Sequence, residues 1–170
     1  TTANDDQVVS YAITVDLSQS TIIAGYKDYD TSGSWGMQTV REQAAAAESA
    51  RGVNVVAAVN GDFYNMGTGQ PTGVLVMNGQ VVNNAAGRNY FAILKDGTAV
   101  IRTGSLQGDE AEAIGGALML ISDGEIAVVG NDSYYTTKQP RTAVGITADG
   151  QVVIVVADGR QAPTSSGYTY

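Results

Sequence analysis

Short apolar runs separated by Asn-Gly or Asp-Gly dipeptides dominate the hydrophobic pattern of this chain. Such dipeptides readily adopt the positive φ angles of the tight turns that join antiparallel strands. Four of them stand between two apolar, β-branched runs: Asn78-Gly79, Asp96-Gly97, Asp123-Gly124 and Asp149-Gly150. The pattern therefore predicts four β-hairpins, two within residues 73–103 and one each within 117–129 and 141–157.

A helix is predicted over residues 37–51, because this segment is rich in strong helix formers and places its small apolar residues on one face. Gly52 is well placed to end the helix. The small apolar face allows the helix to lie close against a sheet. The apolar run 53–59 follows at once, and we predict that it is a strand buried on both sides.

The remaining pattern completes the expected fold class. Residues 8–17 and 21–26 are predicted to open the chain as a pair of strands, and residues 107–113 to form one or two helical turns. With 170 residues and a hydrophobic fraction of 44%, the chain can build the core of one domain. We therefore expect a single domain over 1–170 of the α+β class, with a strand-rich mixed sheet, several hairpins and at least one packed helix (about 37–51).

Charge and hydropathy exclude two classes of partner. The net charge is −8 and the nine Lys and Arg residues are scattered, so a nucleic-acid backbone is not an expected partner. No apolar run reaches the length that spans a bilayer. The low charged fraction of 15% fits an extracellular or cell-surface protein. The acidic residues Asp109, Glu110 and Glu112 are expected to be solvated surface charges.

The chain contains no Cys and no His. Their absence excludes a disulfide framework, a thiolate nucleophile, a Ser-His-Asp triad and a His-ligated metal within this chain. General acid or base chemistry therefore falls to Asp, Glu, Tyr or Lys. Because no spaced calcium loop of the EF-hand type is present, we expect no metal site and no cofactor, while calcium held by Asp oxygens stays open.

Two apolar runs end in a turn dipeptide that leads into a polar loop instead of a second strand. The run 53–59 leads into Asn60-Gly61-Asp62, and the run 151–157 leads into Asp158-Gly159-Arg160. Loops at strand ends are common positions for binding and catalytic side chains. Asp62 and Asp158 are therefore candidate acids, bases or nucleophiles, and Asn60 is a candidate for holding a substrate hydroxyl. The alternative is that both dipeptides are structural turns.

Three arginines are candidates for binding a phosphate. Arg141 begins a predicted strand after a long polar loop, where its guanidinium can hold a phosphate by two parallel hydrogen bonds or form a structural ion pair with an Asp. Arg160 is either a phosphate ligand or a solvated charge, and Arg88 is a lesser phosphate candidate. Tyr64 is able to stack on a sugar ring, although exposed Tyr residues are common in loops.

Four segments combine Gly, Asn, Asp and Arg in motif-like order: residues 60–73 (NGDFYNMGTGQPTG), 76–79 (VMNG), 141–145 (RTAVG) and 156–161 (VADGRQ). Together they resemble the phosphodiester glycosidase family. Residues 35–40 (WGMQTV) add a similarity to bacterial, cell-surface members of that family. The resemblance therefore covers most of the chain.

The resemblance implies hydrolysis of a sugar 1-phosphodiester of the N-acetylglucosamine-1-phosphate type, on glycans or cell-surface polymers. It implies catalytic roles for Asp62 and Asp158, which the strand-end argument also selects. The substrate contacts that it implies lie at Asn60, Gly61, Tyr64, Gly73, Arg141, Thr142, Gly159 and Arg160. A carbohydrate phosphodiester is accordingly the expected partner.

The chain departs from the family pattern at one point. Family members continue past a segment like residues 165–169 to a strand that ends in an Asp-Gly-Gly-Gly-Ser motif, which this sequence lacks. We therefore expect a domain truncated at its C-terminus and a companion C-terminal fragment that completes it. The gap adds weight to an alternative, a non-catalytic carbohydrate-binding or structural module of a surface protein. A third interpretation, a general phosphodiesterase, would need a metal.

Overall fold

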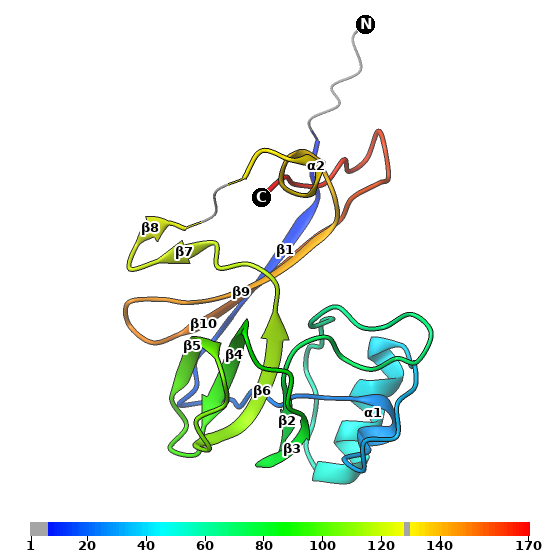
Figure 1. Ribbon diagram of the computed structural model, residues 1–170, viewed down its shortest axis with the longest axis vertical. Helices are drawn as coiled ribbons and strands as arrows, with labels where there is room; N and C mark the ends of the chain where they lie inside the picture. Colours follow the sequence, from blue (N-terminus) through cyan, green and yellow to red (C-terminus); the bar gives the residue numbers. More distant parts are fainter. Residues whose placement is uncertain (1–6, 128–129) are drawn as a thin grey trace, which may run out of the picture. The chain divides into compact units, whose positions relative to one another are not determined.

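The structure, a computed structural model, describes residues 7–127 and 130–170. The chain forms two compact units: unit 1 comprises Thr1–Val15 and Leu118–Tyr170, and unit 2 comprises Asp16–Ala117. Both contain antiparallel sheets and little helix (Figure 1), which confirms the strand-rich character predicted for the fold. Every pair between the named strands is antiparallel, so a mixed sheet, which also needs a parallel pair, stays a prediction. The single domain also stays a prediction.

A five-stranded antiparallel sheet in the order β3-β2-β6-β4-β5 forms the centre of unit 2. Its strands are β2 (Leu75–Met77), β3 (Gln80–Asn83), β4 (Arg88–Leu94), β5 (Ala99–Gly104) and β6 (Glu110–Gly116). The predicted hairpins around Asn78-Gly79 and Asp96-Gly97 are confirmed as the β2–β3 and β4–β5 pairs. At the first of these turns both residues have positive φ angles, 50° and 75°, as a two-residue hairpin turn requires.

The core of unit 2 lies on both faces of this sheet. Val74 and Val76 belong to a buried cluster with Tyr90, Ala92 and Ala113. Leu75 and Met77 alternate with them and belong to a second cluster, with Ala24 and Tyr26. Because successive residues of a strand point to opposite faces, β2, whose three residues are all buried, is covered on both sides.

The predicted helix is confirmed as α1 (Val40–Arg51). It begins after Thr39, whose side chain accepts from the Glu42 N–H while the Glu42 carboxylate accepts from the Thr39 N–H, and it ends at Gly52 in the left-handed conformation. Arg51 anchors its last turn. The Arg51 guanidinium donates to the Tyr29 hydroxyl of the short helix η1 (Lys27–Tyr29) at 2.7 Å and to Glu112 of β6 at 2.9 Å.

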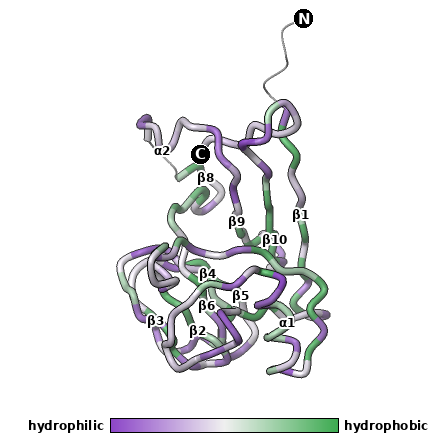
Figure 2. Tube along the Cα trace, turned by 90° about the vertical axis from the view of Figure 1, so that its right-hand side faces the viewer, coloured by the Kyte–Doolittle hydropathy of each residue, from purple (hydrophilic) through white to green (hydrophobic). Residues whose placement is uncertain are grey.

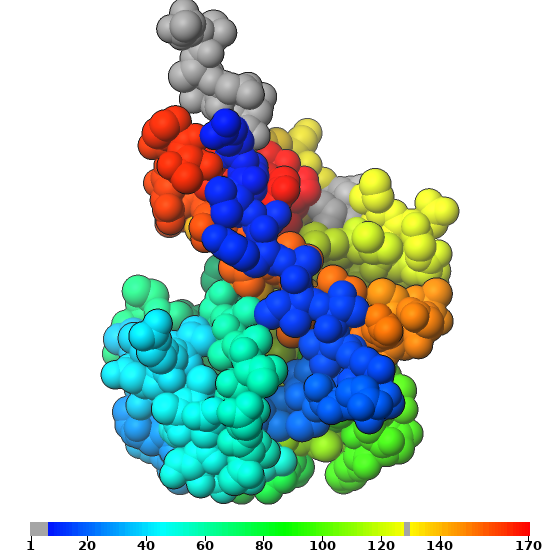
Figure 3. Space-filling model, turned by 180° about the vertical axis from the view of Figure 1, so that it is seen from behind, coloured from blue at the N-terminus to red at the C-terminus, as the bar shows by residue number. Residues whose placement is uncertain are grey.

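Residues 53–59 do not form the predicted two-sided strand. No strand is assigned to them, and the Val56 side chain is 87% exposed. The sheet of unit 2 ends at β3 and β5, and neither edge pairs with this segment, so it has no neighbours that bury both of its faces. The segment is tethered to α1 by the Val55 N–H, which donates to Glu48 at 2.8 Å, and it lies at the surface in cyan to teal in Figure 3.

Three further expectations for unit 2 are wrong. Residues 21–26 form no strand, although Ala24 and Tyr26 are buried. Residues 107–113 are not helical, because the chain turns at Gly108, with a φ of +86°, and enters β6 at Glu110. The carboxylates of this segment are inside the sheet: Glu110 is 4% and Glu112 is 6% exposed, so neither is the solvated charge that we expected.

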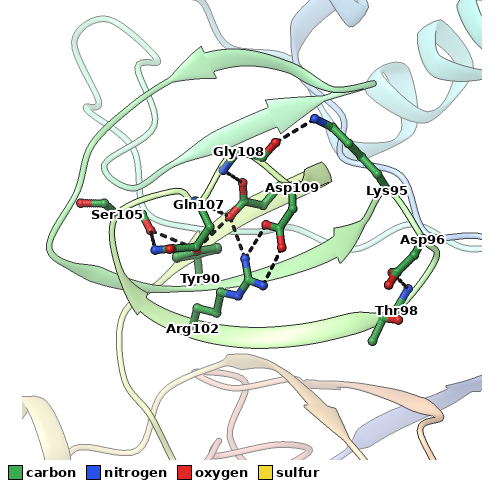
Figure 4. A network of polar contacts seen from close by, with 10 residues as sticks. Tyr90, Lys95, Asp96, Thr98, Arg102, Ser105, Gln107, Gly108 and Asp109 are labelled. Atoms are coloured by element: carbon green, nitrogen blue, oxygen red, sulfur yellow. Dashed lines mark hydrogen bonds and ion pairs between the residues drawn. The ribbon is translucent and has the colours of Figure 1, made fainter.

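Glu110 is the centre of a buried polar network, and its partners Tyr90, Arg102, Gln107 and Gly108 are labelled in Figure 4. It accepts from the N–H groups of Gln107 and Gly108, both at 2.9 Å, from the Tyr90 hydroxyl at 3.0 Å and from Arg102 at 3.1 Å. Burial alone would raise the pKa of the Glu110 carboxyl, but these donors hold the pKa below its usual value. Desolvation and the bond to Glu110 raise the pKa of Tyr90. The network therefore keeps a buried carboxylate charged.

Unit 1 is built around a three-stranded antiparallel sheet in the order β1-β10-β9. Its elements are β1 (Ser10–Val15), β7 (Ile121–Ser122), β8 (Glu125–Ile126), α2 (Ser133–Thr136), β9 (Arg141–Ile146) and β10 (Val152–Ala157). The hairpins predicted around Asp123-Gly124 and Asp149-Gly150 are confirmed as the β7–β8 and β9–β10 pairs. Residues 128–129, which end the first of these predicted hairpin regions, lie outside the described residues.

The predicted strand at 8–17 is confirmed as β1, but its partner is not residues 21–26. β1 pairs with β10, so that Ser10 lies opposite Ala157 and Val15 lies opposite Val152. β10 is an unbroken apolar run and is drawn green in Figure 2, whereas β1 is an exposed edge strand, blue in Figure 3. The central position of β10 explains its continuous apolar sequence.

Candidate functional site

The most distinctive polar group in unit 2 is the Asp62 side chain. It is only 3% exposed, and its Oδ1 accepts from Arg88 Nη2 at 2.9 Å. Its second oxygen, Oδ2, is buried and has no hydrogen-bond partner among the described residues, and the same is true of Arg88 Nε. A buried carboxylate with one oxygen paired and the other unpaired is uncommon in folded proteins, where buried polar atoms are nearly always satisfied.

Two glycines make the space in which the Asp62 carboxylate lies. An ideal Cβ on Gly73 or on Gly115 would lie 2.5 Å from Asp62 Oδ2. Each of these Cβ atoms would also lie within 2.8 Å of the other glycine's Cα. Gly115 is in β6 and donates its N–H to Val74 O at 2.9 Å, so Gly73, which precedes β2, lies beside Gly115. Only residues without a side chain leave room for the carboxylate here.

The local sequence around Asp62 fixes its position. Gly61 packs on Ile114 of β6 so closely that a Cβ there would overlap that side chain. After Asp62 the chain makes a narrow loop, in which Thr72 N–H donates to Phe63 O at 2.8 Å and Tyr64 bridges to Pro71. Asn83 of β3 then donates to Gly73 O at 2.6 Å and holds the return to β2. The motif 60–73 is therefore a loop clamped at both ends to the sheet.

The other candidates of this motif line the same loop. Tyr64 is 45% exposed at the loop surface, where a ring can reach a ligand. The Asn60 side-chain nitrogen donates to Gly61 O at 3.4 Å, which is a weak contact within the turn. The structure thus brings Gly61, Asp62 and Gly73 together. A direct contact of Asn60 or Tyr64 with a substrate stays a prediction.

In unit 1, Arg141 and Asp158 stand at the same end of the β9–β10 pair, since Arg141 lies opposite Ala157. Arg141 Nε donates to Tyr168 O at 3.2 Å, and its Nη2 lies 3.2 Å from Thr137 O and 3.4 Å from Tyr134 O. Its guanidinium carbon also lies 3.7 Å from the centre of the Tyr170 ring. These contacts favour a structural role, although the expected partner, an Asp, is replaced by backbone carbonyls.

The segment that follows β10 is held by backbone and serine contacts. Asp158 N–H donates to Val9 O at 2.9 Å, and the fully buried Ser165 hydroxyl donates to Asp158 O at 2.8 Å. Gly159 lies against Pro140, whose nitrogen would be 2.5 Å from a Cβ at that position. Arg160 is exposed, has a φ of +59° and donates from Nε to the Gln139 side chain at 2.5 Å.

A largely apolar pocket of about 280 Å³ opens beside this segment within unit 1. Arg141 and Thr142 contribute to its wall from β9, and Val155 and Ala157 contribute from β10. Tyr168 and Tyr170 are also among its lining residues. The pocket therefore places the predicted substrate residue Thr142 beside an apolar cavity with aromatic walls.

Comparison with known protein families shows the family to which the chain belongs. A family model described as phosphodiester glycosidase matches residues 53–170, which is more than half of the chain and includes the four motif segments. The chain belongs to the phosphodiester glycosidase family.

Known members of the phosphodiester glycosidase family are similar over most of this chain. The N-acetylglucosamine-1-phosphodiester alpha-N-acetylglucosaminidases of Bos taurus and Homo sapiens are each 30% identical to it, over 71% and 75% of its length. The alignments cover 27% and 29% of those relatives, so the chain spans less than a third of their length.

A solved phosphodiester glycosidase structure shares the fold. The catalytic domain of the zebrafish N-acetylglucosamine-1-phosphodiester alpha-N-acetylglucosaminidase, auto-inhibited by its pro-peptide, is 26% identical to this chain. It matches with a TM-score of 0.53 over 65% of this chain and 42% of that domain. The similarity in sequence and the similarity in structure thus point to the same family.

Residues 7–127 and 130–170 of this phosphodiester glycosidase chain offer neither a clustered metal site nor a membrane-spanning helix. No group of three or more Asp or Glu side chains is arranged to hold a metal ion there. No helix in the same residues is long and apolar enough to cross a membrane.

We expect Gly115→Ala to lower the free energy of unfolding by about 1–3 kcal/mol, because the new methyl group must displace the Asp62 carboxylate or separate β2 from β6. Gly116→Ala is the matched control, since the nearest atom to its Cβ would be Asn89 O at an ordinary 3.8 Å. Urea unfolding followed by circular dichroism measures both variants. Equal stability of the two variants would contradict the tight fit around Asp62.

Proposed function

We propose that this chain is part of an enzyme that hydrolyses a sugar 1-phosphodiester and releases the sugar from a phosphate-linked group. The observation that supports it most is the buried Asp62 carboxylate, paired on one side with Arg88 and unpaired on the other, inside the segment that matches the family. A preorganised charge of this kind can stabilise charge that develops in a transition state.

The roles proposed for the individual residues follow from their positions. Asp62 and Asp158 supply acid, base or electrostatic assistance, and Arg160 orients the phosphate from the exposed loop after β10. A phosphate contact by Arg141 stays a prediction, since its guanidinium donates to backbone carbonyls. The proposal needs no metal and no cofactor. The remaining predicted substrate contacts are Asn60, Gly61, Tyr64, Gly73, Thr142 and Gly159.

The proposed substrate carries N-acetylglucosamine, because the names of the relatives state that they act on an N-acetylglucosamine-1-phosphodiester. We extend this sugar to the present chain and propose glycans or cell-surface polymers as its source. An extracellular or cell-surface location is supported by the low charged fraction and the acidic net charge, and a bacterial type by the resemblance of residues 35–40 to bacterial members of the family.

A second candidate is a non-catalytic carbohydrate-binding module. Such a module would bind the same sugar phosphodiester without turning it over.

The methyl phosphodiester of N-acetylglucosamine, followed by ³¹P NMR, separates these functions. A phosphodiester glycosidase breaks the bond between the anomeric carbon and oxygen, so we expect free N-acetylglucosamine and methyl phosphate, with turnover unchanged by a chelator. Formation of N-acetylglucosamine 1-phosphate and methanol, abolished by the chelator, would show a metal-dependent phosphodiesterase instead. Binding without any product would favour the carbohydrate-binding module.

A further inference from the structure

We propose that Arg88, held in place by Asp62, is a phosphate-binding residue of this site, an inference that rests on the proposed function. Arg88 is the first residue of β4 and follows Gly87, which has a φ of +92°. Its Nη2 donates to Asp62 Oδ1 at 2.9 Å. Its side chain therefore projects from the end of a strand towards the clamped loop that carries the family motif.

The two side chains of the Asp62–Arg88 pair differ in their exposure to solvent. The Asp62 side chain is 3% exposed and lies in the space left by Gly73 and Gly115, whereas the Arg88 side chain is 30% exposed. A ligand that arrives from solvent therefore meets the guanidinium before it meets the carboxylate. This order makes Arg88 the contact residue and Asp62 the positioning residue.

The hydrogen bonding of this pair is incomplete. Asp62 Oδ2 and Arg88 Nε are both buried, and neither has a partner among the described residues. Unpaired buried polar atoms cost folding free energy, and they commonly mark a place that a ligand or an ordered water completes. A phosphate oxygen is a suitable acceptor for the guanidinium, while a substrate hydroxyl is a suitable donor to Asp62.

The other paired arginines of unit 2 have more hydrogen-bond acceptors than Arg88 has. Arg102 makes three bonds to the carboxylates of Asp109 and Glu110. Arg51 donates to a tyrosine hydroxyl and to Glu112. Arg88 has a single acceptor among the described residues, Asp62 Oδ1, although a guanidinium carries five N–H donors. Most of its donor capacity is therefore available to a ligand.

The chemistry of the Arg88 guanidinium favours a phosphodiester anion as its ligand. A guanidinium binds phosphate through two parallel hydrogen bonds, and its charge does not depend on pH in the range in which proteins are stable. Asp62 restricts the side-chain rotamers of Arg88 before the ligand arrives, so less conformational entropy is lost on binding. The pair thus provides a preorganised phosphate contact at the end of β4.

The test uses inorganic phosphate as the probe and the complete 170-residue chain. Arg88→Gln is expected to weaken phosphate binding at least tenfold by calorimetry. Arg88→Lys is expected to show a smaller loss, because lysine keeps the positive charge but lacks the two parallel N–H donors of a guanidinium. Arg41→Gln is the matched control, since it removes the same charge from the exposed start of α1. We expect its affinity to stay within twofold of wild type.

A measurement on the wild-type protein keeps the test valid even if a variant misfolds. The ¹⁵Nε–H resonance of Arg88 in the wild-type protein, assigned by its loss in Arg88→Lys, should shift on phosphate titration. Asp62→Asn should broaden this resonance in the free protein, because the positioning contact is weakened. A purely structural ion pair would give no phosphate-dependent shift.

The inference is overturned if wild-type protein shows no saturable phosphate binding, if Arg88→Gln binds within twofold of wild type, or if Arg41→Gln loses as much affinity. Turnover of the sugar phosphodiester is recorded separately. Absence of turnover together with phosphate binding through Arg88 would refute the proposed function alone. Normal turnover with an unresponsive Arg88 would refute this inference alone.

Discussion

Glu110→Ala is expected to lower the free energy of unfolding by about 3–5 kcal/mol, the range found when one partner of a buried charge pair is removed. The Glu110 side chain is 2% exposed and accepts from two backbone N–H groups, the Tyr90 hydroxyl and Arg102. Removing it leaves all of these donors without that acceptor in a site that water cannot easily reach. Chemical unfolding in urea at neutral pH measures the loss.

Asp109→Ala is the control for Glu110→Ala. Asp109 bonds the same arginine, at 2.6 and 2.9 Å, but its side chain is 47% exposed, so solvent replaces the lost contact. We expect a much smaller loss of stability. If both variants lose equal stability, burial is not what makes Glu110 important.

The pKa of Glu110 provides a second readout of the same prediction. Because the pKa is lower in the folded protein than the usual value of 4.5, the stability that the shift contributes is fully present above about pH 4.5. It is lost as the pH falls through the depressed folded pKa. The difference in stability between wild type and Glu110→Ala should therefore shrink in acid, and a constant difference down to pH 2 would contradict the shift.

Asp62→Asn is expected to lower the rate of sugar phosphodiester hydrolysis by about 10²–10⁴-fold, the range associated with a positioned acid, base or charge. The substitution keeps the shape of the side chain but removes the charge that pairs with Arg88 at 2.9 Å. The neutral amide can neither act as a base nor hold the guanidinium as firmly. Release of free sugar under single-turnover conditions measures the effect.

Asp123→Asn is the matched control for Asp62→Asn. Asp123 occupies the exposed turn between β7 and β8 with a φ of +52°, a conformation that Asn adopts equally well. We expect an unchanged rate and an unchanged melting temperature. Near-normal turnover by Asp62→Asn with a native circular dichroism spectrum would remove Asp62 from the proposed mechanism.

The sequence predicted the hairpins and the helix, which depend mainly on interactions between residues close together in the chain. All four hairpins were predicted because Asn-Gly and Asp-Gly turns depend on the φ angles of two residues, such as Asn78 and Gly79. The helix was predicted for a similar reason, since its strong helix formers and its stop at Gly52 are local signals. These features need no knowledge of distant parts of the chain.

The errors arose where distant parts of the chain decide the structure. The apolar run 53–59 has the composition of a buried strand, but which strands flank it is a property of the sheet order. Glu110 and Glu112 were interpreted as surface charges because their partners, Tyr90, Arg102 and Arg51, lie on other elements, β4, β5 and α1. β1 likewise pairs with β10 at the other end of the chain.

The candidate site was predicted in part. Asp62 and Gly73 were selected by motif, and the structure places them in contact. Arg88 was a minor candidate, because nothing in its local sequence shows that β4 starts beside the loop that carries Asp62. The one available signal was the position of Arg88 directly after a glycine, at the beginning of an apolar run. Only the folded sheet brings Arg88 to Asp62 and thereby shows that Arg88 belongs to the candidate site.

The pairing of β1 with β10 has a consequence for biosynthesis. Residues of β1 leave the ribosome before any part of unit 2, and residues of β10 leave it after all of unit 2. At about 5–20 residues per second, β1 waits many seconds for its partner. Unit 2 comes from one continuous stretch and can complete its sheet during that delay. The nascent chain must therefore carry an unpaired strand with Tyr11 and Ile13, a target for chaperones and for misassembly, until β10 is made.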